Sequence, residues 1–231
     1  MKRIMILCVL ALFLPGGTLE AMEPDWEFLK ETDGIRVYRR DVPGMDFDAF
    51  QGKAIVHARI EVIGMVLRDV LAYPEWMPNC KETQLIETFD KQNVIIHQVN
   101  KTPWPLKNRD SVVKANTTIT WRNGVFTVDL QAIDDPRVPP HPNRIRITKM
   151  SGRWQLTYLH RDQTFVSYMI CLDPGGSLPK YIVKKNMQDA PVNMLRSLRK
   201  VVKNPIYLET ADQSEDRKMI EEYIKRGLLT E

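Results

Sequence analysis

The stretch Asp173-Pro174-Gly175-Gly176-Ser177-Leu178-Pro179-Lys180 decides the fold, because it joins an apolar, strand-like segment at residues 164–168 to a long amphipathic run. Gly175 and Gly176 can adopt positive φ without steric cost, so the chain can reverse its direction there. Pro179 suits the first turn of a helix, where its missing N–H would have had no helical partner. With Trp154 in a preceding strand, this order predicts two strands, a sharp turn and a long C-terminal helix.

The predicted helix has one apolar face. Apolar side chains recur along it at spacings of three and four residues, at Val183, Met187, Ala190, Met194, Leu198 and Val201. Methionine side chains adapt to irregular surfaces. A soft helix face laid against a curved sheet would enclose an apolar space, which favours a carrier of a hydrophobic molecule over an enzyme.

The rest of the chain predicts an antiparallel sheet within an α+β fold. Alternation and turn residues delimit strands at residues 35–39, 47–57, 85–89, 94–100, 111–121, 125–133, 145–159 and 164–172. Asn123-Gly124 predicts a hairpin. Helices are expected at residues 24–31, 60–71 and 215–229, the last capped by Ser214 and preceded by a polar linker at 210–215.

Length and composition indicate a single globular domain. The chain has 231 residues, of which 27% are charged and 43% hydrophobic. Its formal net charge of +4 comes without a dense basic stripe, so we expect no nucleic-acid partner. The spacings of the histidines and cysteines match no metal-ligand pattern. We expect a monomer without metal or cofactor.

Residues 1–21 are typical of a secretory signal peptide. Lys2 and Arg3 precede an apolar run at residues 4–14, and a cleavage site follows near Ala21. Export to the periplasm or the exterior is therefore expected; the alternative is an uncleaved membrane anchor. The binding domain would then span residues 22–205, and a linker with a C-terminal helix would occupy residues 206–231.

Two cysteines, Cys80 and Cys171, remain in the predicted mature chain. Both lie in predicted strands, where a cysteine behaves as a small buried hydrophobe. In an exported protein the alternative is a disulfide between them.

Several motifs together resemble START lipid-transfer domains. Trp26 and Phe28, followed by Gly34-Ile35-Arg36-Val37-Tyr38, are similar to the opening of those domains. Pro103-Trp104-Pro105-Leu106-Lys107-Asn108-Arg109-Asp110 resembles their central loop and the start of the strand after it. Gly152-Arg153-Trp154 and the stretch from Asp173 to Pro179 resemble their C-terminal signature. The resemblance covers roughly residues 24 to 204 and is to the exported bacterial type.

This resemblance implies a helix-grip fold, in which a curved antiparallel sheet wraps a long C-terminal helix and encloses a lipid-sized tunnel. Sterol-binding members place an acidic residue and an arginine on the two strands that flank the central loop. The matching positions here hold Gln98 and Ala115, which argues against a sterol and leaves the ligand class open. The predicted pocket residues are Gln98, Ala115, Phe126, Val128, Leu130, Met187 and Met194.

The expected function is binding and transfer of a lipid or other hydrophobic small molecule, without catalysis. Helix-grip enzymes of the polyketide cyclase and aromatase type are the alternative, but the apolar strand face of Phe126, Val128 and Leu130 argues against them. A third possibility is an accessory protein whose partner binds the terminal helix.

Trp104 lies between two prolines, which present its ring in a defined direction. It would cap the mouth of the pocket or enter a membrane interface, where amphipathic rings are favoured. The alternative is a buried loop anchor. The loops around Trp104 and residues 136–142 are the expected gates.

Titratable residues in the sequence have structural explanations. His97 lies within a strand and is expected to be a hydrogen-bonded sheet residue rather than a general base. Asp134-Asp135 precede Pro136, where turn formation explains them. Asp110 is expected to form an ion pair with its neighbour Arg109. No catalytic residue is predicted.

Overall fold

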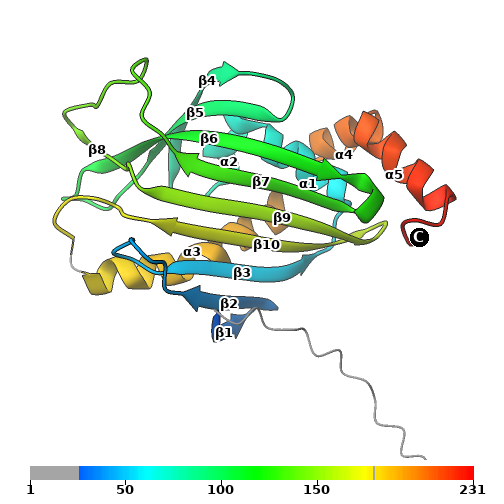
Figure 1. Ribbon diagram of the computed structural model, residues 1–231, viewed down its shortest axis with the longest axis horizontal. Helices are drawn as coiled ribbons and strands as arrows, with labels where there is room; N and C mark the ends of the chain where they lie inside the picture. The colour runs from blue at the N-terminus through cyan, green and yellow to red at the C-terminus, as the bar shows by residue number, and fades with distance from the viewer. Residues whose placement is uncertain (1–25, 179) are drawn as a thin grey trace, which may run out of the picture.

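A large curved sheet forms one layer of the molecule, and helices pack against its inner face (Figure 1). The computed structural model describes residues 26–178 and 180–231. The predicted signal peptide and the cleavage site near Ala21 therefore lie outside the described residues. Within the described chain, no helix is long and apolar enough to cross a membrane.

The strands follow the order β1-β2-β3-β10-β9-β7-β6-β5-β4, and β8 pairs with β6 at the side of this path. Their bounds are β1 Glu27–Thr32, β2 Ile35–Arg40, β3 Ala49–Val56, β4 Cys80–Thr88, β5 Asn93–Asn100, β6 Asn108–Thr120, β7 Val125–Ala132, β8 Arg144–Arg146, β9 Met150–His160 and β10 Gln163–Leu172. Neighbouring strands are antiparallel except β6 and β8, which are parallel.

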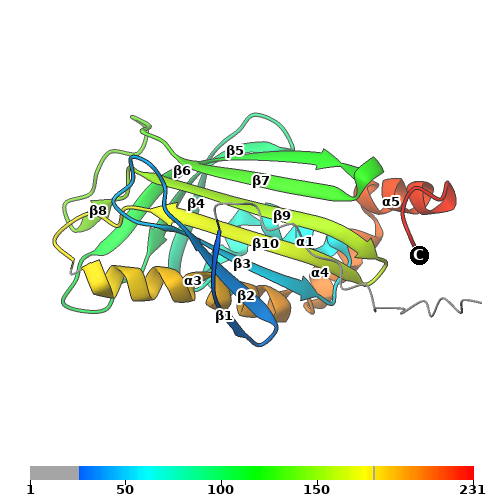
Figure 2. The same cartoon turned by 60° about the horizontal axis from the view of Figure 1, so that its bottom comes forward.

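The helices are α1 Ile60–Arg68, α2 Tyr73–Trp76, α3 Lys180–Val201, α4 Pro205–Asp212 and α5 Glu215–Lys225, with short 3-10 helices at Val70–Ala72 and Trp121–Asn123. The long α3 runs beneath β2, β3 and β10 (Figure 2). Helices α4 and α5 continue past it, and α4 packs on α1. The predicted α+β, helix-grip architecture is confirmed.

Alternation along the strands determines which side chains enter the core. In β7, Phe126 and Val128 are buried, whereas Thr127 and Asp129 point to the other face. Gly52 of β3 lets α3 approach closely, since an added Cβ would lie 2.8 Å from Cβ of Pro191 and 3.0 Å from Cδ1 of Leu195.

Several sequence-based element predictions are wrong. Residues 27–31, expected in a helix, belong to strand β1, because pairing with β2 along the sheet edge overrides local helix preference. The strand expected at 145–159 is two strands, because β8 pairs with the start of β6 while β9 pairs with β7 and β10. The linker expected at 210–215 begins within α4, whose Tyr207 and Ala211 are buried.

Other local predictions are confirmed. Ser214 caps α5 by accepting a hydrogen bond from the Arg217 N–H. The β6–β7 hairpin turns at Asn123-Gly124, where Gly124 has φ of 62°. Cys80 and Cys171 are buried and free, so no disulfide joins them.

Candidate functional site

Six of the seven predicted pocket residues meet in one apolar cluster between the sheet and the helices. Ala115, Phe126, Val128, Met187 and Met194 are buried in this cluster, and Leu130 packs against it. Gln98 is half-buried on β5 and lies opposite Ser111 of β6. The Gln98 amide donates hydrogen bonds to Sδ of Met77 at 3.4 Å and to Oδ1 of Asn100 at 3.1 Å.

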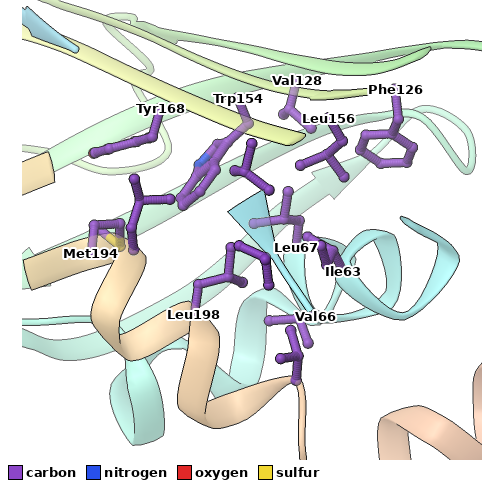
Figure 3. Packing of buried hydrophobic residues seen from close by; sticks show 14 of the residues in the cluster. Ile63, Val66, Leu67, Phe126, Val128, Trp154, Leu156, Tyr168, Met194 and Leu198 are labelled. Atoms are coloured by element: carbon purple, nitrogen blue, oxygen red, sulfur yellow. The ribbon is translucent and has the colours of Figure 1, made fainter. Parts of the chain in front are cut away.

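The cluster has a sheet side and a helix side (Figure 3). The sheet contributes Phe126 and Val128 from β7, Trp154 and Leu156 from β9, and Tyr168 from β10. Across from them lie Met194 and Leu198 of α3 and, from α1, Ile63, Val66 and Leu67. We call this set, with the other buried residues packed on it, the interior cluster.

Side chains fill the interior cluster closely. Phe50, Leu195 and Leu198 are each less than 2% exposed, as are Phe126 and Leu156. A small pocket of about 130 Å³ opens at its edge, between the segment before β3 and the start of α3, lined by Asp46, Phe47, Asp48, Phe50, Lys184 and Met187. Met187 is thus the one predicted pocket residue that borders this opening.

A larger groove of about 710 Å³ lies at the other end of the molecule. Most of its lining residues are of polar or charged type, among them Arg68 of α1, Gln92 of the β4–β5 turn and Asp216 of α5, although Met65 and Ile119 also line it. None of the predicted pocket residues lines it. The expected lipid-sized tunnel is therefore neither of these two pockets; its place between sheet and α3 is taken by the interior cluster.

Two aromatic pairs contribute polar groups to the interior cluster. The rings of Trp154 and Tyr168 lie 4.3 Å apart at 36°, and those of Tyr73 and Trp76 lie 5.8 Å apart, edge to face. The Tyr73 hydroxyl donates to the main-chain oxygen of Leu67 at 2.7 Å. Sequence reasoning treated Trp154 as a fold marker only, although its alternation with Leu156 and Tyr158 already indicated an inward side chain.

Trp104 is 93% exposed in the loop between β5 and β6, so the buried-anchor alternative is wrong. Leu106 in the same loop is also exposed, as are Tyr181 and Ile182 at the start of α3. Figures 1 and 2 place this loop and the start of α3 at the same end of the molecule. We call these four exposed side chains the apolar rim.

Arg109 hydrogen-bonds to the end of the β5–β6 loop and to the segment between β10 and α3. Its guanidinium donates to the main-chain oxygens of Lys107 at 2.7 Å, Pro174 at 3.3 Å and Gly175 at 3.4 Å. Burial lowers the pKa of this guanidinium. The predicted ion pair between Arg109 and Asp110 is wrong, because neighbouring residues of a strand point to opposite faces.

Asp110 instead joins His97 and Arg146 on the outer face of the sheet. Its Oδ2 lies 2.9 Å from Nε2 of His97 and accepts from Nε and Nη2 of Arg146 at 3.1 and 2.8 Å. The side chains of all three residues are no more than 10% exposed. His97 is thus a hydrogen-bonded sheet residue, as predicted.

Asp135 forms the turn that its sequence position predicted. Its carboxylate accepts from the side chain of Arg137 and from the Arg137 main-chain N–H at 3.0 Å. These bonds lower the pKa of Asp135 to about 2. A structural turn accounts for this carboxylate.

Comparison with known proteins agrees with this geometry. The family model of the START domain matches residues 18–206. The chain belongs to the START domain family.

Two relatives cover most of this START protein. An uncharacterized protein of Pseudomonas aeruginosa is 30% identical over 199 residues, which is 86% of this chain and 97% of the relative. The bovine phosphatidylcholine transfer protein is 23% identical over 182 residues, which is 78% of this chain and 84% of the relative.

Solved structures share the fold. A STAR-related lipid transfer protein fragment from Xanthomonas axonopodis superposes with a TM-score of 0.71 at 29% identity, covering 78% of this chain and 99% of that chain. Human STARD10 gives a TM-score of 0.74 at 20% identity, covering 82% and 78%. These likenesses confirm the resemblance first seen in the sequence motifs.

Proposed function

We propose that this START protein binds a lipid or similar hydrophobic molecule between the sheet and α3 and transfers it between membranes, without catalysis. The observation that carries the proposal is the interior cluster, in which apolar side chains of the sheet and of α3 face one another. Burial of apolar ligand surface contributes about 25 cal/mol per Å². Related proteins named for lipid transfer support the same reading.

Uptake requires α3 to move away from the sheet, because side chains fill the interior cluster. The pocket beside Met187 is the proposed opening, since it already reaches a buried member of that cluster. Gln98 and Ala115 would lie deeper along the strands, on the inner face they share with Val113. The non-catalytic reading is supported by His97, Asp110 and Asp135, whose hydrogen bonds account for them structurally.

The apolar rim would contact the membrane during transfer. Trp104 and Tyr181 are 93% and 74% exposed, and Lys101, Lys107, Lys184 and Lys185 are exposed in the same two segments. Indole rings are favoured at membrane interfaces, and basic residues near a surface are attracted to anionic lipids. The rim would therefore bring the opening beside Met187 to an anionic bilayer.

The test replaces Trp104 by Ala and measures transfer of a fluorescent phospholipid between vesicles. We expect a several-fold slower transfer rate with nearly unchanged equilibrium binding, because the rim acts on access and not on the enclosed ligand. Phe89→Ala is the matched control, since Phe89 is an exposed aromatic residue in the β4–β5 turn at the other end of β5. A transfer rate equal to that of the unchanged protein would refute the role of Trp104.

We also propose that the protein is exported and cleaved near Ala21, on the strength of its N-terminal sequence. N-terminal sequencing of protein recovered outside the cytoplasm tests this. A mature chain that begins at Met1 would exclude cleavage.

A further inference from the structure

Arg109 is a buried cation without a carboxylate partner. The residue lies near the start of β6 and is 4% exposed, and no carboxylate of a described residue pairs with it. Burial alone lowers the pKa of its guanidinium, whereas a neighbouring carboxylate would raise it. An unpaired charge is costly to bury. The stability of the fold therefore does not by itself explain why this position holds an arginine.

The acceptors of Arg109 belong to two segments that are far apart in the sequence. One acceptor is the main-chain oxygen of Lys107, at the end of the β5–β6 loop, and the others are those of Pro174 and Gly175, in the turn between β10 and α3. The loop carries two side chains of the apolar rim, and the turn leads into the helix start that carries the other two. Both segments lie at one end of the molecule (Figures 1 and 2).

Within the part of the chain that the structure describes, no other hydrogen bond joins these two segments. The remaining hydrogen bonds of residues 101–107 and of the described residues in 173–186 stay within each segment or lead elsewhere in the sheet and its loops. The turn also packs closely on β8, since a Cβ added at Gly176 would lie 2.9 Å from Cδ1 of Ile145. Arg109 and this packing together fix the turn relative to the loop.

The shape of the guanidinium suits this link. Its N–H groups point outward in a fixed, planar fork. In Arg109, Nη1 donates to the loop at 2.7 Å, while Nε and Nη2 donate to the turn at 3.3 and 3.4 Å. One rigid group thus sets the spacing of the two segments. A lysine would keep the charge, but its single nitrogen would not serve both sets of oxygens at once.

We propose that Arg109 is a positioning residue, which holds the two halves of the apolar rim in one arrangement so that Trp104 and Tyr181 enter a membrane surface together. This inference rests on the proposed membrane contact of the rim. Two contacts on one rigid unit bind a surface more tightly than two contacts that move independently, because the second contact needs less ordering. In this role Arg109 acts through the rim and does not itself touch lipid.

The test is a double-mutant cycle on binding to vesicles of phosphatidylcholine and phosphatidylglycerol, measured by sedimentation. We expect Tyr181→Ala to weaken binding of the otherwise unchanged protein about threefold to tenfold, and Arg109→Lys to weaken it by a similar factor. In the Arg109→Lys background, Tyr181→Ala should then weaken binding by less than about twofold, because the two rings no longer meet the bilayer as a unit. A merely structural role of Arg109 would lower the melting temperature but leave the effect of Tyr181→Ala the same in both backgrounds.

Spin labels at Leu106→Cys and Lys185→Cys measure the spacing of the two segments directly. Both positions are exposed, whereas the native Cys80 and Cys171 are buried. We expect one narrow distance distribution in the protein that keeps Arg109 and a broader one after Arg109→Lys. A broad distribution with Arg109 in place would overturn the inference even if the lysine variant did not fold.

Arg153→Lys is the matched control, because Arg153 pairs with Asp129 at 2.6 Å on the outer face of the sheet. It should change neither vesicle binding nor the effect of Tyr181→Ala. If the unchanged protein does not bind the vesicles, the proposed membrane contact fails and this inference fails with it. If the protein binds and Tyr181→Ala has the same effect with Arg109 and with Arg109→Lys, only the role of Arg109 is overturned.

Discussion

Asp110 shows at the scale of one residue how a buried carboxylate links three strands of the sheet. It is 1% exposed and joins β5, β6 and β8 through His97 and Arg146. Burial alone would raise the pKa of this carboxyl, but the hydrogen bonds from Arg146 and His97 outweigh it and hold the pKa below its usual value. The charged form is therefore the one that the folded protein stabilises.

Replacing Asp110 by Asn should lower the free energy of unfolding by about 3 kcal/mol at pH 7, because it leaves the mostly buried Arg146 without its counter-charge. A carboxyl whose pKa is depressed in the folded state stabilises above its unfolded pKa and loses that effect as pH falls through the folded pKa. The difference between the two proteins should thus shrink below about pH 4. Urea unfolding at pH 7 and pH 3 measures it; an equal difference at both values would contradict the assignment.

At the scale of the element, α3 has two unlike halves. Towards its C-terminal end, Arg196 pairs with Asp33, and Arg199 donates to the main-chain oxygens of Asp33 and Ile55. Just before the middle of the helix, Asp189 accepts from Lys30 at 2.6 Å. Towards its start, Tyr181, Ile182 and residues 184–186 are exposed. Pro191 lies between the halves and lacks the N–H that would continue the helical ladder.

Backbone amides of residues 182–188 should therefore exchange with deuterium faster than those of residues 193–200, because the first half has fewer ties to the sheet. Hydrogen-exchange mass spectrometry of the lipid-free protein tests this. If the proposed opening beside Met187 is right, bound lipid should slow exchange mainly in the first half. Uniform exchange along α3 would argue against an opening helix start.

Helix α5 is attached to α1 through a buried carboxylate. Glu61 is fully buried, and its Oε1 lies 3.1 Å from Nη1 of Arg217 and 3.4 Å from Nε of Arg59, while Oε2 has no hydrogen-bond partner among the described residues. Burial raises the pKa of Glu61, and the two arginines only partly offset this. Folding therefore favours the protonated form of the Glu61 carboxyl. This contribution to stability is present below the pKa of Glu61 in the unfolded chain and is lost as the pH rises through its pKa in the folded protein.

Arg217→Met should lower stability by about 1–3 kcal/mol at pH 7, because Glu61 loses a charged hydrogen-bond partner. The loss should diminish as pH falls and Glu61 takes up a proton. Lys218→Met is the control: the neighbouring Lys218 pairs with Glu215 at the surface, and its loss should cost less than about 0.5 kcal/mol. Thermal unfolding of both variants at pH 7 and pH 5 measures these losses of stability. Equal losses in the two variants would show that the contact between Arg217 and Glu61 does not cause the effect.

At the scale of the whole molecule, the proposed binding of a lipid within the interior cluster would couple ligand binding to stability. A ligand that binds only the folded state stabilises it by mass action, by about 2.7 kcal/mol at one hundred times its dissociation constant. We therefore expect delipidated protein to melt at a lower temperature than protein reloaded with an acyl lipid. Calorimetry before and after organic extraction measures this, and identical melting curves would argue against an enclosed lipid.

Several turns, one helix cap and the buried faces of the main elements could be predicted from the sequence, because they depend on local chemistry. The turn at Gly175-Gly176, the hairpin at Asn123-Gly124 and the Ser214 cap each depend on residues a few positions apart. The alternation of Phe126 and Val128 and the period of α3 likewise identified the buried faces, because both repeats depend only on backbone geometry. The START resemblance rested on motifs of this kind.

Only the tertiary structure decided which distant segments meet. Strand β1 forms because β2 lies beside it, and Asp110 bonds to Arg146 because β8 runs parallel to β6. The exposure of Trp104 is also a tertiary fact, as is the burial of Nε1 of Trp76 without a hydrogen-bond partner among the described residues. Whether a polar atom in the interior finds a partner depends on every element packed around it, and no periodicity along the chain carries that information.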